Sequence, residues 1–225
     1  DVNVSGNYAA SETGKAMGGA IASYGEVSIS HNKGDVNVSG NYAASKTAMG
    51  GAIFAQNGLS IVNNEGNVTF SGNYVKNGDT HRLNSVDVQA GKVELAAAEG
   101  KSISFYDSVL VGAGSEMLLN SYTDASGQEQ TSTGAIVFSG ANAVETLQQL
   151  KGEGGTESDG EISASLTSNI NRAVRVAGGS LQVKDGAVLQ MQSLGVNTGA
   201  ELLIGAGSTV GGVDKDITVT FAADS

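Results

Sequence analysis

Histidine is the side chain most often used for acid–base catalysis, and this chain contains only two, His31 and His81. The residue equivalent to His31 one repeat later is Asn63, so the fold does not require an imidazole at that position. A G-x-S-x-G nucleophile motif is absent from the sequence. We therefore interpret both histidines as turn residues rather than as members of a catalytic triad.

Paired carboxylates would be the clearest sign of a glycoside hydrolase or polysaccharide lyase. Asp214 and Asp216 are separated by Lys215, and their surroundings predict a solvated turn at a strand end. The densest polar set lies near a repeat boundary and comprises Asp79, His81, Arg82 and Asp87. Neither group has a spacing that indicates catalysis, so we predict no catalytic residue.

Metal and phosphate sites are equally poorly supported. Glu157, Asp159 and Glu161 lie in a Gly-rich stretch where calcium is conceivable, but the Gly-Gly-x-Gly-x-Asp repeat of calcium-binding β-rolls is absent. The Gly-Lys-Ser sequence at 100–102 matches the end of a phosphate loop, yet Leu95 stands where that motif needs its first Gly. We predict a turn entering a strand there, with no cofactor site and no metal site in the chain.

The composition of the 225 residues narrows the function further. The absence of Cys excludes disulfides, thiolate chemistry and Cys-ligated metals. A formal net charge of −11 disfavours nucleic acid and anionic membrane surfaces as partners. No run of about 18 apolar residues predicts a membrane-spanning helix. Because residues 1–4 already read as structured sequence, we expect the chain to be a middle piece of a longer protein.

An internal repeat predicts the β-strands that would position a functional site. Residues 1–13 recur at 35–47 with one substitution, and the sequence AMGGAI follows each copy, at 16–21 and 48–53. From this block onward the offset is 32 residues, which is typical of stacked repeat architectures. Each repeat contains three short segments in which small or aliphatic residues alternate with polar ones, as in β-strands.

Three strands per repeat, separated by Gly, Asn or Asp, predict an all-β right-handed parallel β-helix, a solenoid with projecting loops. Equivalent residues should then stack between coils, with Ile21 on Ile53, Ile29 on Ile61 and Val38 on Phe70. The recurring Asn residues should stack at turns, where Asn tolerates the left-handed conformation and its amide can bond along the stack; these are Asn7, Asn41 and Asn73, together with Asn32 and Asn64.

We divide the chain into a repeat part at 1–90 and a continuation of the β-helix at 91–225. At about 25 residues per coil the chain would form roughly nine coils. Two stretches interrupt the pattern: the polar segment 120–133 predicts a projecting loop, and 141–150 predicts a short helix followed by a flexible excursion at 151–161.

The repeats resemble those of the polymorphic outer membrane proteins best known from chlamydiae, which are type V autotransporters. That family is marked by GGA[ILV] and FxxN tetrapeptides, and the first occurs here at 18–21 and 50–53. The second is intact at 70–73, and four degenerate copies with an aliphatic residue in place of Phe lie at 4–7, 29–32, 38–41 and 61–64. The segment 99–107, which ends in Phe-Tyr-Asp, is also similar to a family block.

The resemblance implies a surface-exposed passenger that acts in adhesion and virulence rather than as an enzyme, located at the bacterial cell surface, in the outer membrane or secreted. It implies two kinds of partner: a protein or glycan on a host or neighbouring cell, and the protein's own C-terminal outer-membrane barrel. The loops at 120–133 and 151–161 are the best candidates for contact. The sequence names no receptor and leaves homo-oligomerisation open.

Two alternatives remain at this point. A β-helical polysaccharide lyase or glycoside hydrolase is suggested by fold analogy alone, and it needs ionisable side chains that converge on one face of consecutive coils. A purely structural spacer would hold a distal part of the protein away from the membrane and would bind no ligand.

Overall fold

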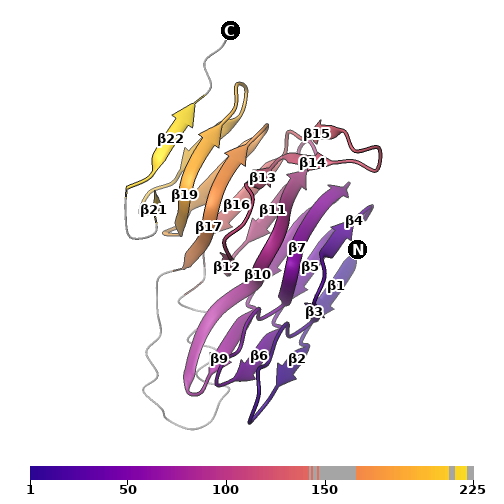
Figure 1. Cartoon of the computed structure of the whole chain (residues 1–225), viewed down its shortest axis with the longest axis vertical. Helices are drawn as coiled ribbons and strands as arrows, with labels where there is room; N and C mark the ends of the chain where they lie inside the picture. Colours follow the sequence, from indigo (N-terminus) through magenta and orange to yellow (C-terminus); the bar gives the residue numbers. More distant parts are fainter. Residues whose placement is uncertain (142, 144–145, 147–165, 213–215, 222–225) are drawn as a thin grey trace.

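The computed structural model describes residues 1–141, 143, 146, 166–212 and 216–221. These residues form a seven-strand sheet, a thirteen-strand sheet and a separate two-strand hairpin. Within the described part, the strand pairs of the two large sheets are parallel apart from β9 and β10, which are antiparallel. Figure 1 shows the strands stacked side by side along the long axis of the molecule. The all-β prediction is confirmed, and the arrangement is β-helix-like.

The seven-strand sheet consists, in spatial order, of β1 (Val2–Ser5), β5 (Val36–Ser39), β8 (Val68–Ser71), β11 (Ser102–Phe105), β16 (Ala135–Ser139), β18 (Ser180–Lys184) and β20 (Glu201–Ile204). The thirteen-strand sheet consists of β2 (Tyr8–Ala10), β3 (Ile21–Ser23), β4 (Val27–Ser30), β6 (Tyr42–Ser45), β7 (Ile53–Asn64), β9 (Tyr74–Asn77), β10 (Thr80–Ala97), β12 (Ser108–Val111), β13 (Met117–Leu119), β17 (Thr167–Val176), β19 (Val188–Val196), β21 (Thr209–Gly212) and β22 (Thr218–Phe221). The hairpin pairs β14 (Ser121–Thr123) with β15 (Glu129–Thr131).

The repeat predicts the register of the first coils correctly. Ile21 pairs with Ile53, Ile29 with Ile61, and Val38 with Phe70. Later coils keep the parallel pairing but lose the constant offset, which is 45 positions from β16 to β18 and 21 positions from β18 to β20. The seven-strand sheet therefore counts seven coils among the described residues, fewer than the nine expected, because the early coils take 32 to 35 residues each.

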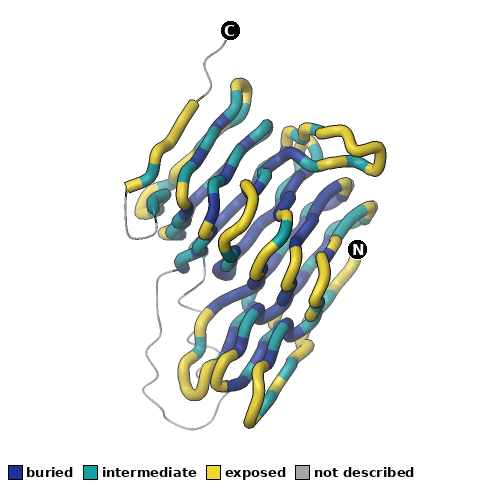
Figure 2. The backbone as a smooth tube through the Cα atoms, in the orientation of Figure 1, coloured by how far each residue is buried: buried dark blue, intermediate teal, exposed yellow. Residues whose placement is uncertain are grey.

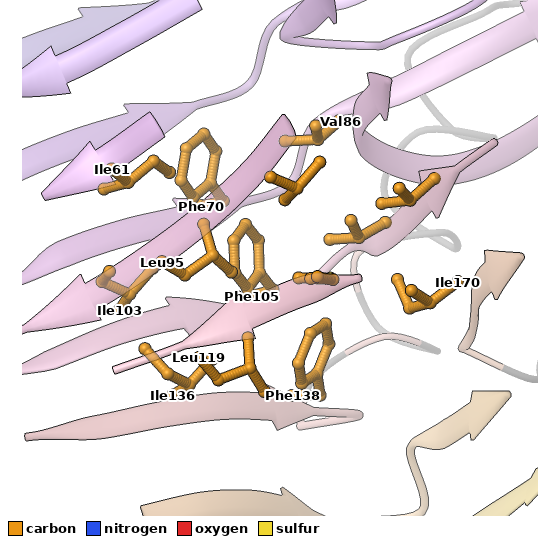
Figure 3. Close-up of a cluster of buried hydrophobic side chains, with 14 of the residues drawn as sticks. Ile61, Phe70, Val86, Leu95, Ile103, Phe105, Leu119, Ile136, Phe138 and Ile170 are labelled. Carbon is orange, nitrogen blue, oxygen red and sulfur yellow. The ribbon is translucent and has the colours of Figure 1, made fainter. Parts of the chain in front are cut away.

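The core is made of side chains from both large sheets that stack along the coils. Figure 2 marks the buried residues along the strands. Phe70, Phe105 and Phe138 form a column of stacked rings with centroids 5.0 and 5.3 Å apart (Figure 3). All three rings are buried, and each stacked pair contributes about 0.5–1.5 kcal/mol beyond the burial of apolar area. A second column, Tyr8–Tyr42–Tyr74, stacks with centroid distances of 5.4 and 4.9 Å.

The paired glycines of the AMGGAI block are dictated by backbone packing. Gly50 has a φ of 61°, and a Cβ there would lie 2.1 Å from the carbonyl oxygen of Ile53. Gly51 faces the next coil, where a Cβ would lie 2.2 Å from the carbonyl oxygen of Asn84. Because both obstacles are backbone atoms, neither position accommodates a side chain.

The stacked asparagines form a hydrogen-bonded ladder along one corner of the coils. The Oδ1 of Asn41 accepts bonds from the backbone N–H and the Nδ2 of Asn7, and the Oδ1 of Asn73 accepts the same pair from Asn41. Each Nδ2 also reaches back to a carbonyl, that of Val4 from Asn41 and that of Val38 from Asn73. Amide bonding along the stack is confirmed, but the left-handed conformation belongs to the residue before each ladder Asn, such as Gly40 with a φ of 62°.

Several local predictions need correction. The sequence predicts that Gly or Asn separates the three strand segments of each repeat; in the second repeat the first two, at 50–55 and 59–64, are not separated by a turn, because β7 runs continuously from Ile53 to Asn64. Likewise β10 continues through a bulge between Ala90 and Val93, where Gly91 has a φ of 78°. Gly therefore bends these long strands instead of ending them. Of the predicted 141–150 helix, Ala143 and Thr146 are helical, while its other residues from 142 on and the excursion at 151–161 lie outside the described residues.

Candidate functional site: a hairpin presented by the coils

The predicted loop at 120–133 is an ordered β-hairpin, formed by β14 and β15, that leaves the stack after β13. Figure 1 shows it projecting from the side of the stack, and Figure 2 shows that most of it is exposed. We call residues 121–131 the hairpin surface. Where the sequence predicts a projecting loop, the structure has an antiparallel strand pair.

A buried asparagine fixes the point where the hairpin leaves the coils. Asn120 has a φ of 56°, and its Nδ2 donates to the carbonyls of Gly134 and Gly178 at 2.8 and 2.9 Å. Its Oδ1 accepts from the backbone N–H of Ala97 at 3.1 Å, and its carbonyl accepts from the N–H of Ser132 at 2.9 Å. Asn120 thus links neighbouring coils through its side chain and closes the base of the hairpin through its backbone carbonyl.

The turn of the hairpin is organised by the carboxylate of Asp124. Its Oδ1 accepts from the backbone N–H and the hydroxyl of Ser126 at 2.8 and 2.6 Å and from the N–H of Gln128 at 3.0 Å. Its Oδ2 accepts from the Nε2 of Gln130 at 2.7 Å. These bonds, led by the Ser126 hydroxyl and the Gln128 N–H, lower the pKa of Asp124 to about 2. The carboxylate therefore holds the turn across the physiological pH range.

Charged side chains anchor the first hairpin strand on the sheet. The buried Glu94 accepts the N–H of Thr123 at 2.9 Å through its Oε1. Lys92 forms an ion pair with Glu94 at 2.5 Å and donates to the hydroxyl of Thr123 at 2.6 Å. Because Glu94 is buried, its bond to the hairpin backbone is shielded from solvent and holds β14 against β10.

Arg175 anchors the second hairpin strand. Its guanidinium forms ion pairs with Glu116 at 2.9 Å and with Glu129 at 3.0 Å. Glu129 also accepts the hydroxyl of Ser121 at 2.7 Å, and that bond together with Arg175 lowers the pKa of Glu129. Exposed pairs of this kind contribute only about 0–1 kcal/mol each, so their main effect is to orient the hairpin.

The two histidines occupy different kinds of position. His31 lies in a turn with a φ of 60°, directly beside Asn63 with a φ of 56° in the next coil, as the repeat predicts. His81 is not a turn residue: it lies in β10, opposite Lys76 of β9, and its ring packs against Tyr74 with centroids 5.8 Å apart. The Val-Asp-Val alternation at 86–88 indicated the later part of this strand, whereas the mostly polar residues 80–85 carry no alternation.

The polar set at 79–87 does not assemble into one site. Asp79 lies at the tip of the β9–β10 hairpin, and Arg82 is opposite Val75 in the hairpin ladder. Asp87 is buried farther along β10, between Phe54 and Leu110 of the neighbouring coils.

The remaining candidate sites for phosphate, catalysis and metal are considered one at a time. The Gly-Lys-Ser segment is a turn into β11, as expected, with Gly100 at a φ of 68°. Asp216 is exposed, whereas Asp214, Lys215 and the acidic residues of 151–161 lie outside the described residues. Within the described ranges, no group of three or more His, Asp or Glu side chains is arranged to hold a metal ion.

Comparison with known proteins gives a consistent result. The chain is 29% identical over 145 residues to probable outer membrane protein pmp10 of Chlamydia pneumoniae, which covers 63% of this chain and 14% of that protein. It is 28% identical over 154 residues to probable outer membrane protein pmp7 of the same organism, covering 66% and 15% respectively. The chain is similar to the chlamydial polymorphic outer membrane proteins. The resemblance seen in the repeats is thus supported by a match that spans about two thirds of the chain and about one seventh of each relative.

No family model matches the chain, and no solved structure matches it. Among the helical residues that the structure describes, none belongs to a helix long and apolar enough to cross a membrane.

Proposed function

We propose that the chain is part of the surface-exposed passenger of a bacterial autotransporter and acts in adhesion to host or neighbouring cells without catalysing a reaction. In this proposal the coils form a right-handed parallel β-helical solenoid, the usual hand of parallel crossovers, that carries the hairpin surface at the outer membrane. The observation that carries the proposal is the anchored hairpin: a stacked β-scaffold holds a polar, exposed strand pair in one orientation. The similarity to probable outer membrane proteins supports the location at the cell surface.

The physical argument for recognition is preorganisation. A loop that is already ordered loses little conformational entropy when it binds, so more of its contact energy appears as affinity. The hairpin turn is held by four bonds to Asp124, and its strands are held by Glu94 and Arg175. Tyr122 adds a half-buried aromatic ring to the projecting strand, a residue type enriched at binding hot spots.

Replacing residues 121–131 by a short Gly-Ser link is expected to reduce binding of the chain to epithelial or neighbouring bacterial cells by at least tenfold. The replacement should leave the coils folded, because Asn120 and Ser132 already lie within one hydrogen bond of each other and the hairpin contributes little to the core. Binding of fluorescently labelled chain is measured by flow cytometry, and folding is checked by circular dichroism and thermal melting.

A matched pair of substitutions removes one tyrosine from the hairpin and one from elsewhere. Tyr122→Ala should weaken cell binding severalfold, whereas Tyr24→Ala, which removes an aromatic ring that is 78% exposed outside the hairpin, should not. Equal binding by the replacement variant and the unaltered chain would show that the hairpin is not the contact surface. If the unaltered chain binds no cell at all, the spacer alternative replaces the adhesion proposal.

A further inference from the structure

The outer edge of β15 is a part of the hairpin surface that the described chain leaves open. β15 pairs with β14 in a separate two-strand sheet, and within the described residues no strand of the two large sheets joins it. Figure 1 shows this hairpin at the side of the stack. The coils before and after the hairpin already pair with each other, so the stacking of a further coil does not extend this edge.

Hydrogen bonds at the two ends of the hairpin show which backbone groups face outward. The N–H of Asp124 donates to the carbonyl of Gln128 at one end, and the N–H of Ser132 donates to the carbonyl of Asn120 at the other, both at 2.9 Å. In an antiparallel ladder, hydrogen-bonded pairs alternate with non-hydrogen-bonded pairs, whose N–H and C=O groups point away from the partner strand. The pairs next to each end of this ladder are therefore non-hydrogen-bonded and direct their backbone groups outward.

The two sides of the hairpin use these outward groups differently. Thr123 with Glu129 forms one of the non-hydrogen-bonded pairs, and Ser121 with Thr131 forms the other. On the β14 side, the N–H of Thr123 donates to the buried carboxylate of Glu94, as the alternation requires. On the β15 side, Glu129 and Thr131 are exposed, and no described residue forms a hydrogen bond with their outward N–H and C=O groups. One edge of the hairpin is thus bonded to the sheet, whereas the other is open.

The side chains along this edge favour one sign of charge in a partner. Arg175 pairs with both Glu116 and Glu129, so two carboxylates surround one guanidinium. The glutamate side chains are 42% and 54% exposed and the arginine side chain is 27% exposed, so the negative groups are the more accessible ones. The whole chain also carries a formal net charge of −11. Local and overall charge both favour a basic partner over an acidic one.

We propose that the open edge of β15 binds an extended polypeptide segment of the partner, which adds to the hairpin as a further strand and carries a basic residue beside Glu129. The outward N–H and C=O groups of Glu129 and Thr131 bond to the backbone of the added strand, as in other cases of strand addition. Open edges are prone to unspecific pairing, and β15 limits it because it is only three residues long and carries a charged side chain. The inference rests on the proposed function, since it names the class of partner that the hairpin surface contacts.

Thr131→Pro tests the edge, because proline removes the outward N–H and is tolerated in an edge strand where that N–H is not bonded to the neighbouring strand. Thr131→Ala is the matched control, since it removes the side chain and keeps the N–H. Binding of labelled chain to epithelial cells is measured by flow cytometry. Thr131→Pro should weaken binding by about tenfold or more, and Thr131→Ala by less than about twofold. Glu129→Pro removes the second outward N–H and should weaken binding as much as Thr131→Pro does.

The hairpin turn is checked in every variant by the NMR amide signals of Ser126 and Gln128, which report the bonds to Asp124 and should not shift. Two treatments of the cells separate a polypeptide partner from a glycan. Trypsin is expected to abolish binding, whereas removal of N-glycans and sialic acids by glycosidases is not.

Three results would overturn the proposal: binding that survives trypsin, binding that is lost after glycan removal, and binding by both proline variants that equals that of Thr131→Ala. In each of these cases a failure of the variant lacking residues 121–131 to bind still identifies the hairpin as the contact surface. If that variant binds as well as the unaltered chain, the proposed function fails and this inference fails with it.

Discussion

Replacing Gly51 by alanine is expected to lower the free energy of unfolding by more than about 4 kcal/mol, enough to leave much of the chain unfolded at 37 °C. A Cβ at this position would lie 2.2 Å from the carbonyl oxygen of Asn84 and 2.6 Å from the backbone N and O of Tyr74. All three atoms belong to the adjoining coil, so relief of the clash requires separation of the coils and loss of the bond from the Ala52 N–H to the Ser85 carbonyl at 3.0 Å. Urea denaturation followed by circular dichroism measures the change.

The control for this substitution is Gly25→Ala. A Cβ at Gly25 would meet only the Oγ of Ser23 at 3.7 Å, which is ordinary contact, and the backbone there is not left-handed. Its free energy of unfolding should therefore stay within about 0.5 kcal/mol of the unaltered chain. If Gly51→Ala were as mild as Gly25→Ala, the coils would not approach each other at the GGAI block as closely as described. Close backbone approach would then not explain the paired glycines.

The repeated part of the fold is predictable because identical spacing imposes identical position in every coil. Val38 and Phe70 have to stack once residues 35–47 and 67–79 follow one another at a fixed offset, and the side-chain alternation then decides which face is buried. After residue 80 the offset varies, so the sequence indicates strands there but not their partners. The pairing of Leu181 with Leu202, only 21 positions apart, could not be inferred from the 32-residue repeat.

The side chains that anchor the hairpin were harder to predict from the sequence, because they come from coils that differ in length. A polar stretch at 120–133 was sufficient to predict a projection, but Arg175 lies 46 positions from Glu129 and no repeat relates the two. The alternation Ser-Asn-Ile-Asn at 168–171 is a usable signal for β17, in which Asn169 and Asn171 lie on the opposite face from the buried Ile170. The residues next to Asp107 and Arg172 in the sequence do not indicate that these two charged side chains are buried.

Asp107 ends the asparagine ladder and occupies the place of the next Asn. Its Oδ2 accepts the N–H and the Nδ2 of Asn73 at 3.0 and 2.8 Å, as the Oδ1 of Asn73 does for Asn41. Its Oδ1 then takes the position where Asn41 and Asn73 carry a donating Nδ2, and this oxygen is buried without a partner. Burial raises the pKa of Asp107 from 3.8 to about 7, against the opposing bonds from Asn73 and Gly72.

The raised pKa makes the stability of the fold depend on pH in a defined direction. Because the folded chain binds the Asp107 proton more tightly than the unfolded chain, this carboxyl favours folding fully below about pH 4, and the benefit is lost as the pH rises toward about 7. The loss is on the order of 4 kcal/mol at 1.4 kcal/mol per pKa unit. Above pH 7 the buried carboxylate destabilises the fold by a constant amount.

Asp107→Asn is therefore expected to stabilise the chain by a few kcal/mol at pH 8 and to change its stability little at pH 4. An amide keeps the acceptor for Asn73 and restores a donor at the unpartnered position, so the ladder continues by one more residue. Urea denaturation at a series of pH values measures the difference between the two chains, which should grow between pH 4 and pH 7 and then level off. Asp79→Asn removes a carboxyl from an exposed hairpin turn and should leave the pH profile unchanged. A constant or shrinking difference for Asp107→Asn would mean that this carboxyl is ionised in the fold at acidic pH, and that the ladder ends in a charge.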